Sequence, residues 1–291
     1  MRVAPRSGLH RHLLLTACVL LAASAAEAQK LEAIDVTLRQ YDGGAGMPAD
    51  WEFAAGDTVY LSFRIAGFRT EEKDDSEFLR LSYRIQTFDP EGLPVIESAA
   101  DSIGAEMTSQ DRGNGWLPVV LLEAPLPQAA PSGGYRFRVE LRDEVGDATT
   151  TEELPFRVRG RDVEPSDELV IRNFRFYRSQ TSLASLSVPA YRPGDTVWAR
   201  FDMTGYEFAD NNRFHINYGL SVLRANGEVL FDQEVAADEQ RESFYPERHI
   251  PGSFGLPLTN DLSEGDYTIV VTVRDLLGDQ VYGTKEIFHV D

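Results

Sequence analysis

Carboxylates are the most abundant chemically active side chains in this sequence, and two of their clusters repeat. Asp143 and Asp147 frame the segment Asp-Glu-Val-Gly-Asp, and Asp275 and Asp279 frame Asp-Leu-Leu-Gly-Asp. Carboxylate oxygens are hard ligands that suit Ca²⁺, so these aspartates are weak calcium candidates, but neither segment has the EF-hand loop pattern with its trailing glutamate. We therefore favour a hairpin turn in which aspartate accepts backbone N–H bonds and glycine takes a positive φ.

Aromatic side chains offer a second kind of chemistry, because an exposed ring can stack on a sugar or anchor a protein partner. We expect them in the long, poorly patterned segments that would form loops. The candidate binding surface consists of Trp116, Phe244, Tyr245 and Phe254. The competing interpretation is that Trp116 closes one end of a hydrophobic core.

No catalytic residues are predicted. His215 and His289 lie in strand-like segments, His249 aligns with Leu117 of the first unit, and no G-x-S-x-G or H-E-x-x-H motif occurs, so we expect ordinary surface histidines. The carboxylate pair of a glycosidase cannot be singled out among so many acidic residues. The sequence therefore predicts neither a cofactor nor an enzyme, and a hydrolase is the least favoured function.

Composition narrows the range of partners. The 291 residues include 28 Lys and Arg against 47 Asp and Glu, which gives a formal net charge of -19. Such a chain repels a nucleic-acid backbone, so no nucleic-acid partner is expected. The single cysteine, Cys18, excludes a disulfide scaffold and a cysteine-based zinc site.

The N-terminal residues 1-28 have the three parts of a secretory signal peptide. Three arginines precede an apolar run, and Ala26-Glu27-Ala28 supplies the small-residue cleavage site. The run is too short to span a membrane, and no later segment could do so. Because Leu15-Thr16-Ala17-Cys18 is similar to a bacterial lipobox, a lipid anchor on Cys18 is the minor alternative. We predict an exported protein, periplasmic or extracellular.

The remaining chain contains the same unit twice. The segment 53-63, with Gly56 in its turn, returns as 191-201 with Gly194, and the segment 135-143 returns as 267-275. Matches in the same order indicate duplication. We predict domain 1 over residues 29-160, a linker over 161-166 rich in turn-forming residues, and domain 2 over 167-291.

Hydrophobic residues alternate with polar ones inside each unit. Phe137 is predicted to point inward and Arg138 outward, and Ile269 takes the inward place of Phe137 in the second unit. The acidic run 71-77 is the best helical candidate, although it lacks an apolar face. About seven short strands per unit predict an all-β chain in which two antiparallel sheets pack face to face.

A resemblance supports this arrangement. The segments around Tyr135 and Tyr267, Gly-Gly-Tyr-Arg-Phe and Gly-Asp-Tyr-Thr-Ile, resemble the start of strand F in immunoglobulin-like and fibronectin III-like domains of exported bacterial proteins. The resemblance implies two tandem β-sandwich domains, with each tyrosine hydroxyl bonded to backbone upstream. Phe137 and Ile269 stand where antibody domains have cysteine, so the resemblance is to the superfamily and not to antibodies.

The sequence predicts a non-catalytic exported protein that acts as a macromolecular interaction or scaffold module. The expected partner is a protein. The alternative is a carbohydrate-binding module that uses loop aromatics and takes a polysaccharide. The fold itself hosts many unrelated functions and does not decide between them.

Overall fold

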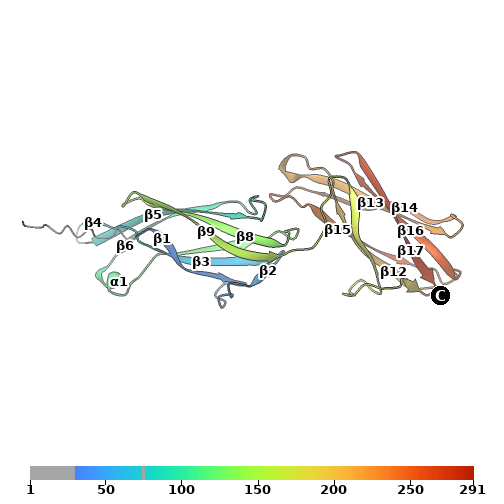
Figure 1. Ribbon diagram of the computed structural model, residues 1–291, viewed down its shortest axis with the longest axis horizontal. Coiled ribbons are helices and arrows are strands. Elements are labelled where there is room, and N and C mark those ends of the chain that lie inside the picture. Colours follow the sequence, from blue (N-terminus) through green and yellow to red (C-terminus); the bar gives the residue numbers. More distant parts are fainter. Residues whose placement is uncertain (1–29, 74–75) are drawn as a thin grey trace, which may run out of the picture.

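The structure is a computed structural model that describes residues 30–73 and 76–291. The predicted signal peptide and Cys18 lie outside the described residues. Within the described part, no helix is long and apolar enough to cross a membrane. Strands are the main secondary structure of the described chain, and they form two sandwiches that follow one another along the molecule (Figure 1).

The first sandwich packs two sheets together. One sheet has the order β1-β3-β7, and the other has the order β2-β9-β8-β5-β4 with β6 also paired to β5. The strand bounds are β1 (Glu32–Arg39), β2 (Glu52–Ala54), β3 (Thr58–Ala66), β4 (Glu71–Lys73), β5 (Ser76–Phe88), β6 (Ala99–Met107), β7 (Val119–Pro125), β8 (Gly133–Asp143) and β9 (Ala148–Arg159).

The second sandwich has the same strand order except that β4 has no counterpart in it. Its sheets have the orders β10-β12-β15 and β11-β17-β16-β13-β14. The strand bounds are β10 (Val170–Tyr177), β11 (Ala190–Tyr191), β12 (Thr196–Thr204), β13 (Phe214–Arg224), β14 (Val229–Arg241), β15 (His249–Pro257), β16 (Gly265–Asp275) and β17 (Gln280–Val290). The predicted fold class, two antiparallel immunoglobulin-like β-sandwiches, is confirmed.

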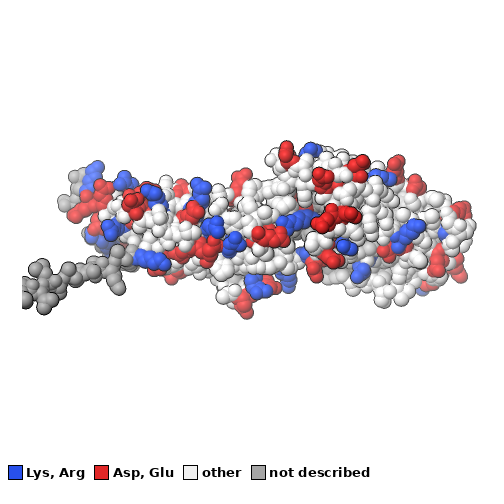
Figure 2. All heavy atoms as spheres, turned by 45° about the horizontal axis from the view of Figure 1, so that its top comes forward, with Lys and Arg blue, Asp and Glu red and all other residues white. Residues whose placement is uncertain are grey.

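The alternation of the strands decides which side chains fill the cores. Phe137 is fully buried and stacks on Phe156, with ring centroids 4.7 Å apart, whereas Arg138 lies on the outer face. Ile269 is 1% exposed at the equivalent place in the second sandwich. Each sandwich therefore has its own hydrophobic core. Figure 2 shows that acidic and basic side chains are interspersed along the visible outer surface.

Matched turns and corners stabilise the two units. The Tyr135 hydroxyl donates to the Pro131 carbonyl at 2.9 Å, and the Tyr267 hydroxyl donates to the Ser263 carbonyl at 2.6 Å, as the resemblance implies. Gly56 and Gly194 have φ of 88° and 87° in equivalent turns. A side chain at either position would be strained, which explains why glycine occurs in both copies.

Matched β-bulges interrupt the first strand of each unit. The pairing of β1 with β3 shifts between Ile34 and Thr37, and that of β10 with β12 shifts between Arg172 and Arg175. The bulges place Asp35 and Asn173 at φ of 54° and 53°. Asp and Asn tolerate this left-handed conformation better than most residues do.

Two local features differ from the sequence expectation. In the acidic run 71-77, the described residues form β4 and the start of β5, which pair antiparallel, so the run is not a helix. A short helix, α1 (Ser109–Gly113), instead follows β6, and Thr108 and Asp111 form its capping box. Reciprocal side-chain bonds at the helix N-terminus stabilise this single turn, which has no apolar periodicity to reveal it.

Candidate functional site

In the repeated aspartate turns, the carboxylate of the first aspartate accepts hydrogen bonds from the protein's own backbone. Asp143 is fully buried, and its carboxylate accepts N–H bonds from Arg69 at 2.8 Å and from Val145 and Gly146 at 3.0 Å. Asp275 is buried in the same way and accepts N–H bonds from Glu207 at 2.8 Å and Leu277 at 3.0 Å. The first aspartate of each turn therefore has the structural role that we favoured.

The expected role of glycine in these turns was wrong. The positive φ belongs to Asp147 and Asp279, at 48° and 52°. Position 146 instead requires glycine because there is no room for a side chain: an added Cβ would lie 2.3 Å from the Asp143 carboxylate. The side chain of Asp147 is 89% exposed and lies 3.3 Å from Arg142. Among the described residues no group of three or more potential metal ligands comes together.

The four candidate aromatics do not form one surface. Trp116 is 41% exposed and its backbone N–H donates to the Asp111 carbonyl, so it lies beside α1 at the end of the first sandwich far from the second (Figure 1). Phe244 is 51% exposed at the junction of the sandwiches. Phe254 is 8% exposed because it points inward from β15. The expectation of a shared aromatic loop platform is not supported by this geometry.

Tyr245 joins the two sandwiches. It belongs to the loop between β14 and β15, yet it is 3% exposed and packs into the hydrophobic core of the first sandwich. Its hydroxyl donates to Oδ2 of Asp89 at 2.9 Å. Oδ1 of this fully buried carboxylate accepts the N–H groups of Glu91 and Leu93 at 2.9 and 2.8 Å. An ion pair between Arg248 and Glu91 adds a second polar contact across the junction.

Burial dominates the electrostatics of the junction. It raises the pKa of Tyr245, and the neighbouring Asp89 raises it further. The same two causes, in the same order, raise the pKa of Tyr135. Both hydroxyls therefore remain protonated donors throughout the physiological range, which suits a structural contact and not proton transfer.

A second polar cluster fixes the connecting segment, the residues around Arg161 and Asp162 that join the two sandwiches, to the second sandwich. Asp202, fully buried, lies 3.0 Å from Nη2 of Arg161 and accepts a bond from Asn173 at 2.9 Å. Asn173 also donates to the carbonyl of Asp162 at 3.0 Å. His249 is 8% exposed beside this cluster, so the expectation of a surface histidine was wrong for this residue.

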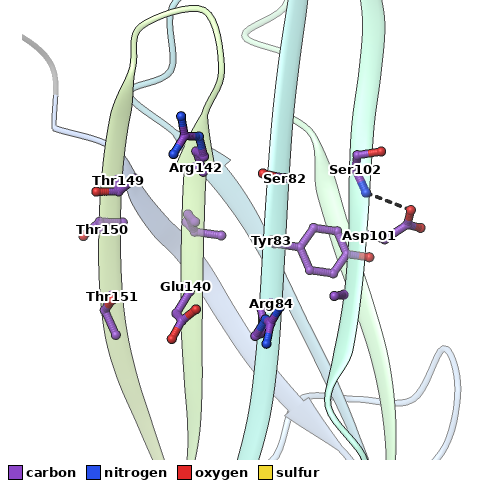
Figure 3. Close-up of a pocket in the computed structure, with 12 residues that line it drawn as sticks. Ser82, Tyr83, Arg84, Asp101, Ser102, Glu140, Arg142, Thr149, Thr150 and Thr151 are labelled. Atoms are coloured by element: carbon purple, nitrogen blue, oxygen red, sulfur yellow. Dashed lines mark hydrogen bonds between the residues drawn. The ribbon is translucent and has the colours of Figure 1, made fainter.

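An open hollow of about 570 Å³ lies on the outer face of the larger sheet of the first sandwich. Figure 3 shows its side chains on the neighbouring strands β9, β8, β5 and β6. The register places Thr151, Glu140, Arg84 and Ala100 in one row across these strands. The parallel row consists of Thr149, Arg142, Ser82 and Ser102.

The charged side chain of one row forms an ion pair with a neighbouring residue, whereas those of the other row do not. Arg142 pairs with Glu144 at 3.1 Å, and bonds from Ser82 and Arg142 hold the pKa of Glu144 below its ordinary value. Arg84 and Glu140 are exposed, and neither forms an ion pair within 4 Å of another described residue. These two side chains can therefore bond an incoming partner without first breaking an internal ion pair.

In the second sandwich the positions equivalent to Arg84 and Glu140 are uncharged. Its register places Gly219 opposite Thr272, which faces Gly283. Sequence reasoning did not include Arg84 or Glu140 among the candidate site residues. The alternation that placed Arg84 and Glu140 on the outer face could have revealed their pairing only once the strand register was known.

Comparisons with known proteins give fold-level likenesses only. No model of a protein family matches the sequence, and no curated protein matches it either. The C-terminal domain of the Streptococcus agalactiae antigen I/II polypeptide BspA is 7% identical, covering 87% of this chain and 99% of that chain with a TM-score of 0.28. The C-terminal domain of Streptococcus pyogenes AspA, of the antigen I/II family, is 9% identical over 90% and 99%, with a TM-score of 0.29. Red sea bream transglutaminase is 10% identical over 90% of this chain and 31% of that chain, with a TM-score of 0.25. Likenesses at this level carry no inference about function.

Proposed function

We propose that the chain is an exported, non-catalytic interaction module that presents the outer face of its first sandwich to a protein partner. The exported location rests on the signal sequence predicted for residues 1–28. The observation that carries the role is the open polar hollow with Arg84 and Glu140, which lack ion-pair partners among the described residues. A wide, shallow hollow of this kind suits a macromolecular surface better than an enclosed small-molecule site.

The junction supports this role by limiting how the two sandwiches move. Tyr245 and Arg248 contact the first sandwich from the second, while Arg161 contacts Asp202 from the connecting segment. A fixed tandem holds the hollow at a defined distance and angle from the second sandwich. Because such preorganisation reduces the entropy lost on binding, it favours a scaffold or docking function.

Chemical crosslinking in the native envelope, followed by identification of the captured protein, tests this proposal. We expect Arg84→Glu to reduce recovery of a specific partner about tenfold or more, because the variant places two carboxylates side by side. Glu140→Arg tests the same hollow by the opposite change, because it places two positive side chains next to each other. Circular dichroism and thermal melting should match those of the unmodified chain, since both residues are exposed.

Thr272→Glu is the matched control, because Thr272 occupies the equivalent outer position of the second sandwich. It should leave partner recovery unchanged. Recovery of the monomer alone under every condition would contradict the proposal, as would a partner lost equally with Thr272→Glu.

A further inference from the structure

β7 is an edge strand that carries exposed apolar side chains. It pairs with β3 on one side only. Val119 and Leu121 are 54% and 70% exposed on its outer face. An unpaired edge with apolar side chains is a template for another strand, and proteins normally block such edges with proline, charge or a covering segment.

Hydrogen bonds at both ends of β7 show which backbone groups are free. The Ile65 N–H donates to the Pro118 carbonyl at 3.0 Å, and the Leu126 N–H donates to the Asp57 carbonyl at 2.8 Å. Because bonded and non-bonded pairs alternate in an antiparallel ladder, the residues with even numbers between these ends bond to β3. The N–H and C=O groups of Val119, Leu121 and Glu123 therefore point away from β3, toward the open edge.

The equivalent edge of the second sandwich is blocked at three positions. The Leu258 N–H donates to the Asp195 carbonyl, and by the same alternation Pro251, Ser253, Gly255 and Pro257 point away from β12. Pro251 and Pro257 have no N–H to offer. The Ser253 carbonyl already accepts a bond from the Tyr218 hydroxyl at 2.6 Å.

The first sandwich shares one of these blocking devices, because Pro125 stands where the second sandwich has Pro257, but it lacks the other two. The registers place Val119 where the second sandwich has Pro251, and Leu121 where it has Ser253. Tyr83, which aligns with Tyr218 in the sequence repeat, lies against β6 beside Asp101 (Figure 3). Among the described residues it forms no hydrogen bond to β7. The edge of the second sandwich is thus more protected than the edge of the first.

We propose that β7 pairs antiparallel with β7 of a second copy of this chain. The free groups form a set that is symmetric about Leu121, so a two-fold axis there places Leu121 opposite Leu121 and Val119 opposite Glu123. Each pair exchanges two backbone hydrogen bonds and joins the β1-β3-β7 sheets of the two copies into one. The symmetry of the free groups favours a second copy over an unrelated strand. This surface is separate from the hollow of the proposed function, so either can fail alone.

Disulfide trapping tests the pairing and its register. In the full chain with Cys18→Ser, each introduced thiol is the sole one. Residues in a hydrogen-bonded pair have Cα atoms about 5.5 Å apart, which suits a disulfide. Leu121→Cys should therefore form a crosslinked dimer on mild oxidation. Val119→Cys and Glu123→Cys should crosslink mainly when the two variants are mixed. Equal crosslinking of all three variants with themselves would overturn the register.

Sedimentation analysis over a wide concentration range tests whether the association exists. The unmodified chain should show a concentration-dependent dimer that salt strengthens, since each copy has a formal net charge of -19 and the copies repel one another. Val119→Pro with Leu121→Ser, which copies the second sandwich, should weaken dimerisation about tenfold or more. The proline removes no ladder bond, because the Val119 N–H is free.

Leu121→Lys is the second variant, and it keeps the strand while adding edge charge. Ser253→Lys, at the matched edge of the second sandwich, is the control and should leave the dimer unchanged. A monomer at every concentration would overturn the proposal, and so would a dimer that survives both β7 variants.

Discussion

The Tyr245 hydroxyl of the second sandwich donates to the buried Asp89 carboxylate of the first across 2.9 Å. The contact joins two hydrophobic units through one hydrogen bond to a charged acceptor, and such bonds are stronger than those between neutral groups. Since Asp89 also bonds two backbone N–H groups of its own turn, the contact links the position of the second sandwich to the shape of that turn.

Removing this hydroxyl should loosen the junction. Tyr245→Phe keeps the ring packed but leaves one oxygen of a buried carboxylate without its donor, at a cost of about 1–3 kcal/mol. Urea unfolding measures the loss, and small-angle X-ray scattering should show a broader range of domain orientations. Tyr41→Phe is the control, because Tyr41 is 62% exposed and its replacement should cost less than about 0.5 kcal/mol. An unchanged scattering profile would argue against a rigid junction.

Strand alternation predicts matched losses in the two cores. Phe137→Ala and Ile269→Ala each remove a buried side chain, and each should cost about 2–5 kcal/mol in unfolding free energy. Arg138→Ala should cost less than about 1 kcal/mol, because the side chain is 39% exposed and pairs with Glu153 on the surface. Similar losses from Phe137→Ala and Arg138→Ala in chemical denaturation would refute the assignment of inner and outer faces.

The buried turn aspartates should behave as structural acceptors and not as metal ligands. Asp143→Ala leaves three backbone N–H groups without their acceptor and should cost about 1–3 kcal/mol. Asp147→Asn should be nearly neutral, since its side chain is exposed and asparagine tolerates a positive φ. Calcium should shift the melting temperature of the unmodified chain by less than about 1 °C. A larger, saturable shift that disappears in Asp147→Asn would contradict this assignment.

His249 should make the protein sensitive to mild acid. Burial lowers the pKa of His249 below its ordinary value of 6.5, although Asp202 opposes the shift and Arg161 adds to it. Below about pH 6.5 the unfolded chain gains a proton that the folded chain does not, so stability falls as the pH falls. The loss continues until the pH reaches the folded-state pKa of His249.

Thermal melting between pH 7.5 and about 5.5 measures this effect, because this interval includes the pH range just below the pKa of histidine in the unfolded chain. His249→Gln should flatten the slope in that range whatever its effect at neutral pH, because glutamine does not titrate. An identical slope in the variant would show that other groups cause the acid sensitivity.

Much of the fold could be predicted because its determinants are local. Alternation placed Phe137 inside and Arg138 outside, and the repeated Gly-x-Tyr pattern located Tyr135 and Tyr267 before their strands. A period of two is sufficient for these assignments, since each residue's face follows from its neighbours.

The site depended on non-local information. Tyr245 was predicted to be exposed because it lies in a poorly patterned loop, yet it inserts into the core of the other sandwich. Arg84 and Glu140 face each other only through the pairing of β5 with β8, far apart in the sequence. Strand register and domain contacts of this kind leave no periodic signal in a single sequence.

The matched bulges show that the two units are no longer interchangeable. Asp35 and Asn173 share the same backbone conformation, but only Asn173 has an amide that can donate to Asp202 and to the connecting segment. At the place of Asp202 the first unit has Arg64, which lies 3.5 Å from Asp35. A chimera built from two first units would therefore lose both the amide that donates to Asp162 and the buried carboxylate beside Arg161. The contacts that fix the residues between the sandwiches thus belong to the second unit alone.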